Sequence, residues 1–170
     1  VVSRAPVPDA DALLTTVPGV PLMMFFADCV PVVIVASGPV RTVAIAHAGW
    51  RGAASGIAGK TAAAAAAEAG CAPGDLLAFV GPRIGPCHYE VGPDTLSYFA
   101  HPSATMRAAP GRLDLGAVVC EDLANVGIQP GSIAVTDACT AEMTDRFYSY
   151  RAEGETGRHA AIAVLLTPKP

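Results

Sequence analysis

Two short apolar runs, VPVVIVA at residues 30–36 and TVAIA at residues 42–46, are separated by turn residues SGP. This pattern predicts two strands paired as a hairpin. An alanine-dominated stretch at residues 52–70 follows and closes on a glycine, which is typical of a helix end. Because strands and a helix follow one another directly, the chain is expected to adopt a mixed α/β fold.

The rest of the chain continues this alternation. At 170 residues, of which 52% are hydrophobic, the chain is long and apolar enough to bury one core, so we expect a single domain over residues 1–170. A loop rich in glycine and proline at residues 81–93 is of the kind that often lines sites. Further strands are predicted at residues 21–26, 76–82, 132–138 and 159–166, and an amphipathic helix at residues 113–126.

Charge and cysteine content narrow the class of partner. The net charge of −4 gives no basic surface for nucleic acid. Pro18, Gly19, Pro21 and Asp28 interrupt the first apolar run, which therefore falls short of the ~20 apolar residues that span a membrane. Five cysteines, an odd number without CxxC spacing, favour reduced thiols in the cytoplasm. Small molecules are the expected partners.

One apparent nucleotide motif is a false match. The run GIAGKT at residues 56–61 resembles the end of a phosphate-binding loop, but the first glycine of that motif would be residue 54, which is alanine. Lys60 is also expected inside a helix rather than at its start, where free N–H groups bind phosphate. We therefore exclude binding of nucleoside triphosphates through this motif.

Cys29 and His47 are the first candidate site residues. Cys29 precedes one strand of the predicted hairpin and His47 ends the other, so their pairing brings thiol and imidazole to the same edge of the sheet. Zinc accepts both ligand types, and a catalytic zinc site has three protein ligands and one open position. On spacing alone, a small buried cysteine and a core histidine are an equally open interpretation.

Trp50 and Arg51 follow His47 in the run AHAGWRG. Arg51 can offer a planar pair of donors to a phosphate or ribose-phosphate oxygen, or it can form a plain surface ion pair. Trp50 can stack on a base, or it can cap the core.

Two further constellations stay open. Cys87 and His88 are neighbours in the glycine-rich loop, and adjacent residues on an extended chain point to opposite sides. We therefore do not expect them to serve one metal or to form a nucleophile–base pair, and loop packing is the plainer interpretation. Residues 147–158 (FYSYRAEGETGR) form either the rim of a substrate site or a solvated hairpin.

Six blocks occur in order along nearly the whole chain: DADALLT (9–15), ADCVPV (27–32), AHAGWRG (46–52), GPRIGPCHYEVG (81–92), LDL (113–115) and DACT…FYSYR…TGR (137–158). Together they resemble the YfiH-like or laccase-domain family, once called multicopper polyphenol oxidases and also peptidoglycan editing factors. The resemblance implies a mixed-sheet α/β/β/α sandwich.

The resemblance also implies a metal site. In this family a zinc ion is held by the His of a QVHG motif, the Cys of ADC and the His of HAGWRG, which correspond here to Cys29 and His47. The QVHG motif lies just upstream of a segment like residues 1–15, so the chain is expected to lack its N-terminal segment. Relatives often have two cysteines where this chain has Cys87 and His88, so the resemblance assigns no role to position 88.

The activity that the resemblance implies is that of a purine nucleoside phosphorylase. Its substrates would be adenosine, inosine, guanosine or methylthioadenosine together with phosphate, and adenosine deamination would accompany it. Cys29 and His47 would be catalytic through zinc, and Arg51, Trp50 and Cys87 would bind substrate.

Three alternatives remain. Multicopper oxidation of phenols is excluded by four histidines without an HxH pair, although Cys29 and His47 could help to hold a single Cu²⁺ ion as in a copper-dependent polyphenol oxidase. A metal-free cysteine hydrolase in peptidoglycan editing would use Cys29 as nucleophile and His47 as base. A non-catalytic binding module is the third.

Overall fold

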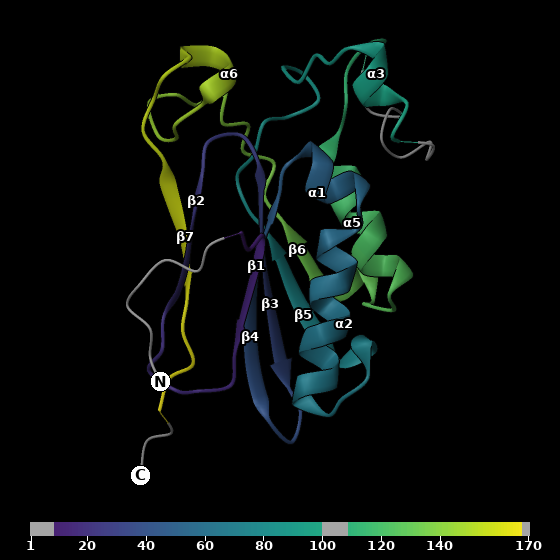
Figure 1. The fold of residues 1–170 in the computed structure, drawn as a ribbon, viewed down its shortest axis with the longest axis vertical. Coiled ribbons are helices and arrows are strands. Elements are labelled where there is room, and N and C mark those ends of the chain that lie inside the picture. The colour runs from purple at the N-terminus through teal and green to yellow at the C-terminus, as the bar shows by residue number, and fades with distance from the viewer. Residues whose placement is uncertain (1–8, 100–108, 168–170) are drawn as a thin grey trace.

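The computed structural model describes residues 9–99 and 109–167, which form three layers (Figure 1). A five-stranded sheet lies in the middle, with helices on one face and a two-stranded sheet on the other. The large sheet has the order β1 (Ala12–Thr15), β4 (Arg41–Ala48), β3 (Val30–Ser37), β5 (Leu76–Val80) and β6 (Ile133–Val135). The small sheet pairs β2 (Leu22–Phe26) with β7 (His159–Ala163).

The predicted hairpin is the centre of the large sheet. Strands β3 and β4 pair antiparallel from Val30 opposite Ala48 to Ser37 opposite Arg41. β1 joins β4 and β5 joins β3, both antiparallel, whereas β6 runs parallel to β5. The sheet is therefore mixed, and the predicted mixed α/β fold class is confirmed.

The helix layer consists of α1 (Trp50–Ala54), α2 (Ile57–Ala69) and α5 (Leu115–Asn125). The alanine-rich α2 buries one face of small side chains against the sheet, and α5 adds larger apolar groups. Asp114 caps α5, because its side chain accepts a hydrogen bond from the amide of Ala117 at 2.9 Å. The shorter elements are the helices α3 (Pro93–Leu96) and α6 (Tyr150–Glu153) and the 3₁₀ turns Pro73–Asp75 and Pro130–Ser132.

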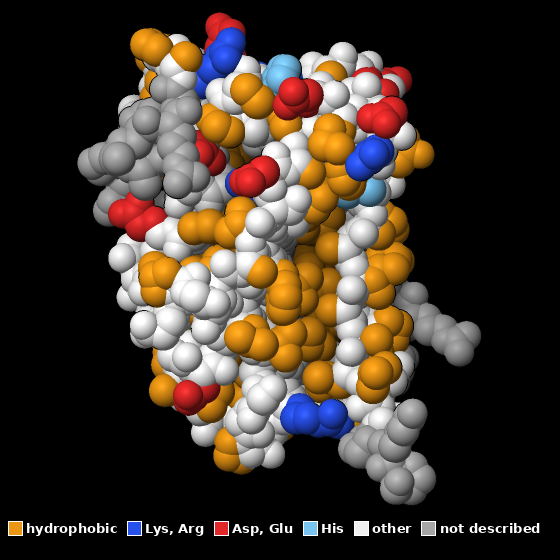
Figure 2. All heavy atoms as spheres, turned by 180° about the vertical axis from the view of Figure 1, so that it is seen from behind, with side chains coloured by type: hydrophobic (Ala, Val, Ile, Leu, Met, Phe, Trp, Pro, Cys, Tyr) orange, Lys and Arg blue, Asp and Glu red, His pale blue; other side chains and the backbone are white. Residues whose placement is uncertain are grey.

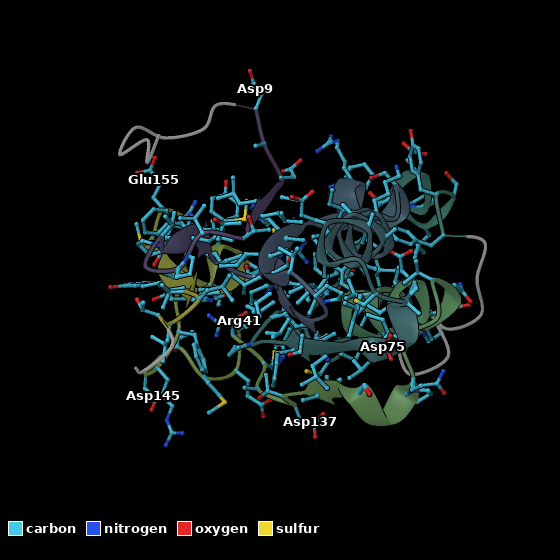
Figure 3. The ribbon with its side chains drawn as sticks, turned by 90° about the horizontal axis from the view of Figure 1, so that it is seen from below. Asp9, Arg41, Asp75, Asp137, Asp145 and Glu155 are labelled. Atoms are coloured by element: carbon cyan, nitrogen blue, oxygen red, sulfur yellow. The ribbon has the colours of Figure 1, made fainter. Side chains whose placement is uncertain are left out.

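The small sheet covers only part of the opposite face. Leu22 and Phe26 of β2 pack with Val43 and Ile45 of β4 in a second buried cluster. At the other edge of the layer, Arg41 donates a hydrogen bond to the carbonyl of Leu166 at 3.1 Å, which ties β4 to the segment after β7 (Figure 3).

Beyond the small sheet, the outer face of β5 and β6 carries an apolar groove of about 570 Å³. Phe79 and Val135 line it and are each more than 40% exposed. Figure 2 shows hydrophobic side chains gathered in a hollow on this side of the molecule. The lining also includes Pro31 and Val33 of β3 and the first residues of β7.

Three local predictions differ from the structure, and one strand was missed. The helix predicted at residues 52–70 is two helices, because Gly56 adopts a left-handed φ of 72° between α1 and α2. The strand predicted at residues 132–138 is confined to β6, and residues 147–158 contain the helix α6 rather than a hairpin. β1 was not predicted as a strand. Residues 1–8, which open the chain, lie outside the described residues.

The break at Gly56 places Lys60 in the first turn of α2, nearer the helix start than predicted. The amide of Gly59 in that turn has no acceptor within its own helix, and it donates instead to the Asp122 carboxylate of α5 at 2.7 Å. A protein carboxylate thus stands where a phosphate-binding loop would place its anion. No helix among the described residues has the length and apolar character needed to cross a membrane.

Candidate functional site

Cys29 and His47 lie at the same end of the central hairpin and on the same face. His47 is directly opposite Pro31 in the register of β3 and β4, and directly opposite residues share a face of an antiparallel pair. Cys29, two residues before Pro31, packs with the cluster beneath the small sheet. The ring centroid of Phe26, from β2, lies 5.0 Å from that of His47. Both predicted ligands therefore face the layer of β2 and β7.

The electrostatics of this pair favour neutral side chains. Burial raises the pKa of the Cys29 thiol above its ordinary value, and the adjacent Asp28 adds to the effect. Burial lowers the pKa of the His47 imidazole. A neutral imidazole offers a lone pair to a metal ion. A thiol with a raised pKa loses its proton readily only when a metal cation takes the place of that proton on the sulfur.

Asp28 fixes the backbone beside Cys29. It is buried and adopts a left-handed φ of 88°, a conformation that aspartate and asparagine tolerate better than most residues. Its Oδ1 accepts a hydrogen bond from the Thr140 hydroxyl and its Oδ2 accepts one from the amide of Arg151, both at 2.7 Å. The sequence showed only an acidic residue interrupting an apolar run, so this role was missed.

Tyr89 brings two arginines to the neighbourhood of Cys29. Burial raises the pKa of the Tyr89 phenol, and the nearby Cys29 adds to this effect. The charges of Arg151 and Arg51 both act to lower it, so both guanidinium groups lie close enough to influence the phenol oxygen. The Arg151 guanidinium lies 5.1 Å from the Tyr89 ring centroid and donates to the Glu90 carbonyl at 2.6 Å. This end of the sheet therefore combines a thiol, a phenol and two cations.

Trp50 and Arg51 begin α1 beside this group. Trp50 is half-buried against the helix-side core, and its ring centroid lies 5.6 Å from that of Tyr98. The Arg51 side chain is exposed, and its guanidinium lies 4.2 Å from the Trp50 ring centroid. Trp50 thus caps the core and also supports the arginine, which keeps its N–H donors available to an anion.

The expectation that Cys87 and His88 point to opposite sides is wrong. The amides of His88 and Tyr89 both donate to the Gly85 carbonyl at 3.0 Å, so the chain makes a turn here and is not extended. The Cys87 Sγ and His88 Nδ1 atoms lie 3.0 Å apart as a result. Cys139, which sequence reasoning left as an ordinary thiol, places its Sγ 3.5 Å from the same nitrogen.

Comparison with known proteins assigns the family. A family model described as multi-copper polyphenol oxidoreductase laccase matches residues 1–166. The chain belongs to this family. It is the YfiH-like, laccase-domain family that the six sequence blocks resemble, so that prediction is confirmed.

Within the laccase family, the chain is similar to proteins named purine nucleoside phosphorylase. One from Xylella fastidiosa is 36% identical over 169 residues, which cover 95% of this chain and 63% of the relative. YlmD of Geobacillus stearothermophilus is 38% identical over 165 residues, covering 92% and 60%. YfiH of Escherichia coli is 34% identical over 163 residues, covering 92% and 64%. The chain thus spans just under two thirds of the length of these relatives.

Solved structures of the laccase family agree with the fold. The crystal structure of Geobacillus stearothermophilus YlmD has a TM-score of 0.86 at 35% identity and covers 95% of this chain and 63% of that one. The crystal structure of a Bacillus licheniformis protein YfiH has a TM-score of 0.81 at 34% identity, with coverage of 91% and 61%.

The laccase-family description suggests a metal, so we ask whether the side chains of this chain suit a metal ion by their chemistry and their number. Sulfur and neutral imidazole nitrogen suit both zinc and copper, so Cys29 and His47 fit as ligands by their chemistry. Catalytic zinc takes three protein ligands. Across the part of the chain that the structure describes, this pair belongs to no group of three or more metal-ligating side chains. Cys29 and His47 therefore suit two of the three protein-ligand positions of a catalytic zinc ion.

Proposed function

We propose that the protein is a zinc-dependent purine nucleoside phosphorylase of the cytoplasm. It would convert adenosine, inosine, guanosine or methylthioadenosine, together with phosphate, to the free base and the sugar 1-phosphate, and would also deaminate adenosine. The names of the relatives support the reaction class. The observation that carries the proposal for this chain is geometric: Arg151 lies 5.1 Å from the Tyr89 ring centroid, and the exposed Arg51 begins α1 at the end of the β3–β4 hairpin where Cys29 lies.

Cys29 and His47 would hold the zinc ion, with a third ligand in the QVHG motif that the family resemblance implies. When bound, zinc supplies a Lewis acid that activates water for the deamination. Burial keeps His47 neutral and therefore ready to bind. The two hydrogen bonds to Asp28 hold the backbone next to Cys29, so the sulfur stays in place while substrates exchange.

The arginines would bind the phosphate. In phosphorolysis a phosphate oxygen forms a bond to the anomeric carbon of ribose, while the glycosidic bond breaks and its electron pair leaves with the purine. Arg51 and Arg151 place positive charge beside Tyr89, and charge-assisted hydrogen bonds from guanidinium groups hold phosphate oxygens well. The raised pKa of Tyr89 keeps its O–H protonated, so the phenol can donate a hydrogen bond to the same anion.

The cysteine hydrolase is disfavoured by the same electrostatics. A nucleophilic cysteine works as a thiolate, which needs a lowered thiol pKa and a histidine that accepts the proton. Here burial raises the pKa of Cys29 and lowers that of His47, so the neutral pair is the stable one. A single-copper polyphenol oxidase stays the second candidate, because the family description names oxidation of polyphenols, although by a multi-copper enzyme.

Product analysis tests the proposal. The protein that includes the QVHG segment implied by the family resemblance is purified and incubated with inosine or adenosine, with and without phosphate, and hypoxanthine, adenine and ribose 1-phosphate are quantified. Residues 1–170 alone supply two of the three expected zinc ligands, so they should release base poorly or not at all. Release of base that depends on phosphate supports the phosphorylase, and inosine formed from adenosine supports the deaminase. Oxidation of a phenolic dye by the copper-loaded protein, without release of base under either condition, would replace the proposal with the oxidase.

A further inference from the structure

A second group of metal-ligating side chains lies where the loops after β5 and β6 meet. Because these strands are parallel neighbours, both loops leave the same end of the sheet. The backbone joins them directly, since the amide of Arg83 donates to the Ala138 carbonyl at 3.3 Å and the amide of Thr140 donates to the Arg83 carbonyl at 2.9 Å. The fold thus brings together two segments that are distant in the sequence.

A tight turn in each loop presents two ligand side chains. The first turn is the one closed on the Gly85 carbonyl, and it carries Cys87 and His88. In the second, the amides of Glu142 and Met143 donate to the Cys139 carbonyl at 3.2 and 3.0 Å. The second turn places Glu142 on the same side as Cys139.

The four ligand atoms lie close enough together for small side-chain movements to place them around one small cation. The two sulfur atoms, the imidazole nitrogen and a carboxylate oxygen all lie within 4.8 Å of one another. The His88 Nδ1 atom is 3.0 Å from the Cys87 Sγ and 3.5 Å from the Cys139 Sγ. Tetrahedral zinc, with bonds of about 2.3 Å to sulfur and about 2.0 to 2.1 Å to nitrogen, separates its ligand atoms by roughly 3.3 to 3.8 Å.

Gly85 leaves room for the two sulfur atoms to converge. A Cβ at this glycine would lie 3.1 Å from the Cys87 Sγ and 3.3 Å from the Cys139 Sγ. Its amide also donates to the Cys139 Sγ at 3.1 Å, a contact that stabilises negative charge on that sulfur. Any larger residue here would crowd both sulfurs.

We propose that Cys87, His88, Cys139 and Glu142 form a zinc site separate from Cys29 and His47. Two thiolates, an imidazole and a carboxylate are donors that zinc accepts, and four protein ligands close its tetrahedral coordination. A closed site of this kind is structural and leaves no position for substrate. It goes beyond the proposed reaction, because it assigns a metal to residues outside the proposed catalytic zinc site, and it gives Cys87 the role of a metal ligand in place of the substrate contact that the family resemblance implies.

Zinc bound here would join the loops after β5 and β6, which position residues beside Cys29. Tyr89 directly follows His88, and Thr140, whose hydroxyl binds Asp28, directly follows Cys139. Zinc bound across the two turns would hold both neighbours in place. Binding to the folded chain alone also raises stability, so zinc should raise the melting temperature.

The experiment isolates this site from the proposed catalytic one. The chain carrying both Cys29→Ser and His47→Ala is stripped with a chelator, kept under reductant and titrated with Co²⁺ as a spectroscopic probe, then with Zn²⁺. We expect one equivalent of Co²⁺ to bind, with the strong visible and thiolate charge-transfer absorption of tetrahedral sulfur ligation. Zn²⁺ should displace the Co²⁺ and raise the melting temperature.

Single variants assign the ligands. Cys87→Ser and His88→Gln change exposed side chains, so the fold should persist in each variant. The Co²⁺ spectrum should be lost in each. Zinc affinity should fall by more than roughly tenfold, which is the cost of removing a residue that only hydrogen-bonds to a metal ligand. Cys71→Ser, which alters a thiol outside both groups, should leave binding unchanged. Circular dichroism confirms that each variant is folded.

Three results would overturn the proposal. The first is a folded, reduced chain that takes up no Co²⁺ or Zn²⁺. The second is uptake that survives both Cys87→Ser and His88→Gln. The third is a chain 2 Da lighter under reductant, in which Cys87 and Cys139 are joined as a disulfide and unable to bind. Because the parent variant lacks Cys29 and His47, none of these results depends on the proposed nucleoside chemistry.

Discussion

The carboxylate of Asp28 joins segments that lie far apart along the chain. Its two oxygens accept from Thr140 and from the backbone at Arg151, and its own carbonyl accepts from the amide of Ile84 at 2.9 Å. The buried carboxylate thus sets the positions of the loop after β6 and the start of α6, and the backbone carbonyl of the same residue sets that of the loop after β5. Cys29 is the next residue, so its position depends on these contacts.

We expect Asp28→Asn to lower the free energy of unfolding by about 1 to 2 kcal/mol. Asparagine tolerates the left-handed φ, so the backbone is not strained. Its amide has one acceptor oxygen, which can keep the bond from the Arg151 amide as a neutral one, while the Thr140 hydroxyl must turn to accept from the new NH₂ group. Denaturant unfolding measures the change. Asp145→Asn, which alters an exposed surface ion pair with Arg146, should have almost no effect. Equal stability of the two variants would show that Asp28 is not a structural junction.

Arg51 is expected to act on the phosphate rather than on the metal. Arg51→Ala should reduce kcat/KM for phosphorolysis by roughly ten- to a hundredfold, since a charge-assisted hydrogen bond contributes about 1.5 to 3 kcal/mol. Zinc content should not change. Lys60→Ala, which removes an exposed cation from α2, is the matched control and should retain activity. Unchanged kinetics over a range of phosphate concentrations would remove Arg51 from the site.

At the scale of elements, the contact between α2 and α5 turns on a glycine. The Gly59 amide donates to Asp122, and a Cβ at this position would lie 2.5 Å from the Asp122 Oδ1 and 3.1 Å from its carbonyl oxygen. Alanine is favoured over glycine within a helix by about 1 kcal/mol. The hydrogen bond to a charged partner contributes about 1.5 to 3 kcal/mol, so its loss outweighs that gain.

Gly59→Ala should therefore destabilise the protein by about 0.5 to 2 kcal/mol, against the ordinary trend for helices. Chemical denaturation followed by circular dichroism gives the value. Gly131→Ala is the control, because a Cβ there meets nothing within 4 Å and should leave stability nearly unchanged. A stabilised Gly59→Ala variant would mean that the Asp122 contact adds little.

The elements that sequence predicted best are those with a strong local pattern. The hairpin of β3 and β4 follows from β-branched runs around a turn, and α5 follows from its amphipathic spacing. The cap at Asp114 was seen only in the structure. The break at Gly56 was missed because an alanine-rich run masks one left-handed glycine. Cys139 and Glu142 could not be joined to Cys87 from sequence, because the parallel pairing of β5 and β6 alone brings them together.

The candidate site was predictable to a similar degree. The hairpin register explains why Cys29 and His47 were expected at one end of the sheet, and their common face agrees with it. Their joint hold on one ion stays a prediction. The role of Tyr89 could not be predicted locally, since its contact with Arg151 joins residues that are distant in the sequence.

For the whole molecule, the outer face of β5 and β6 is an exposed apolar surface. Phe79 and Val135 remain exposed beside a groove of about 570 Å³, and contiguous apolar patches on a protein surface commonly bind other apolar groups. We expect this chain to bind a hydrophobic fluorescent dye, and Phe79→Ser with Val135→Thr to reduce the fluorescence several-fold. Val40→Thr, at an exposed apolar position outside the groove, should not. Equal loss in both would place the dye elsewhere.

The pairing of β2 with β7 has a consequence for the order in which the protein folds. Leu22 pairs with Ala163 and Phe26 with His159, so the two strands come from opposite ends of the described chain. Long-range pairing forms slowly, because the entropy of closing the intervening chain must be overcome first. During synthesis, β2 cannot pair until β7 has been made, whereas the hairpin of β3 and β4 can already form. Pulse-labelled hydrogen exchange during refolding should show the amides of β3 and β4 protected before those of β2. Until β2 packs in place, the face of the hairpin that Phe26 covers in the folded protein remains exposed to chaperones and to other nascent chains.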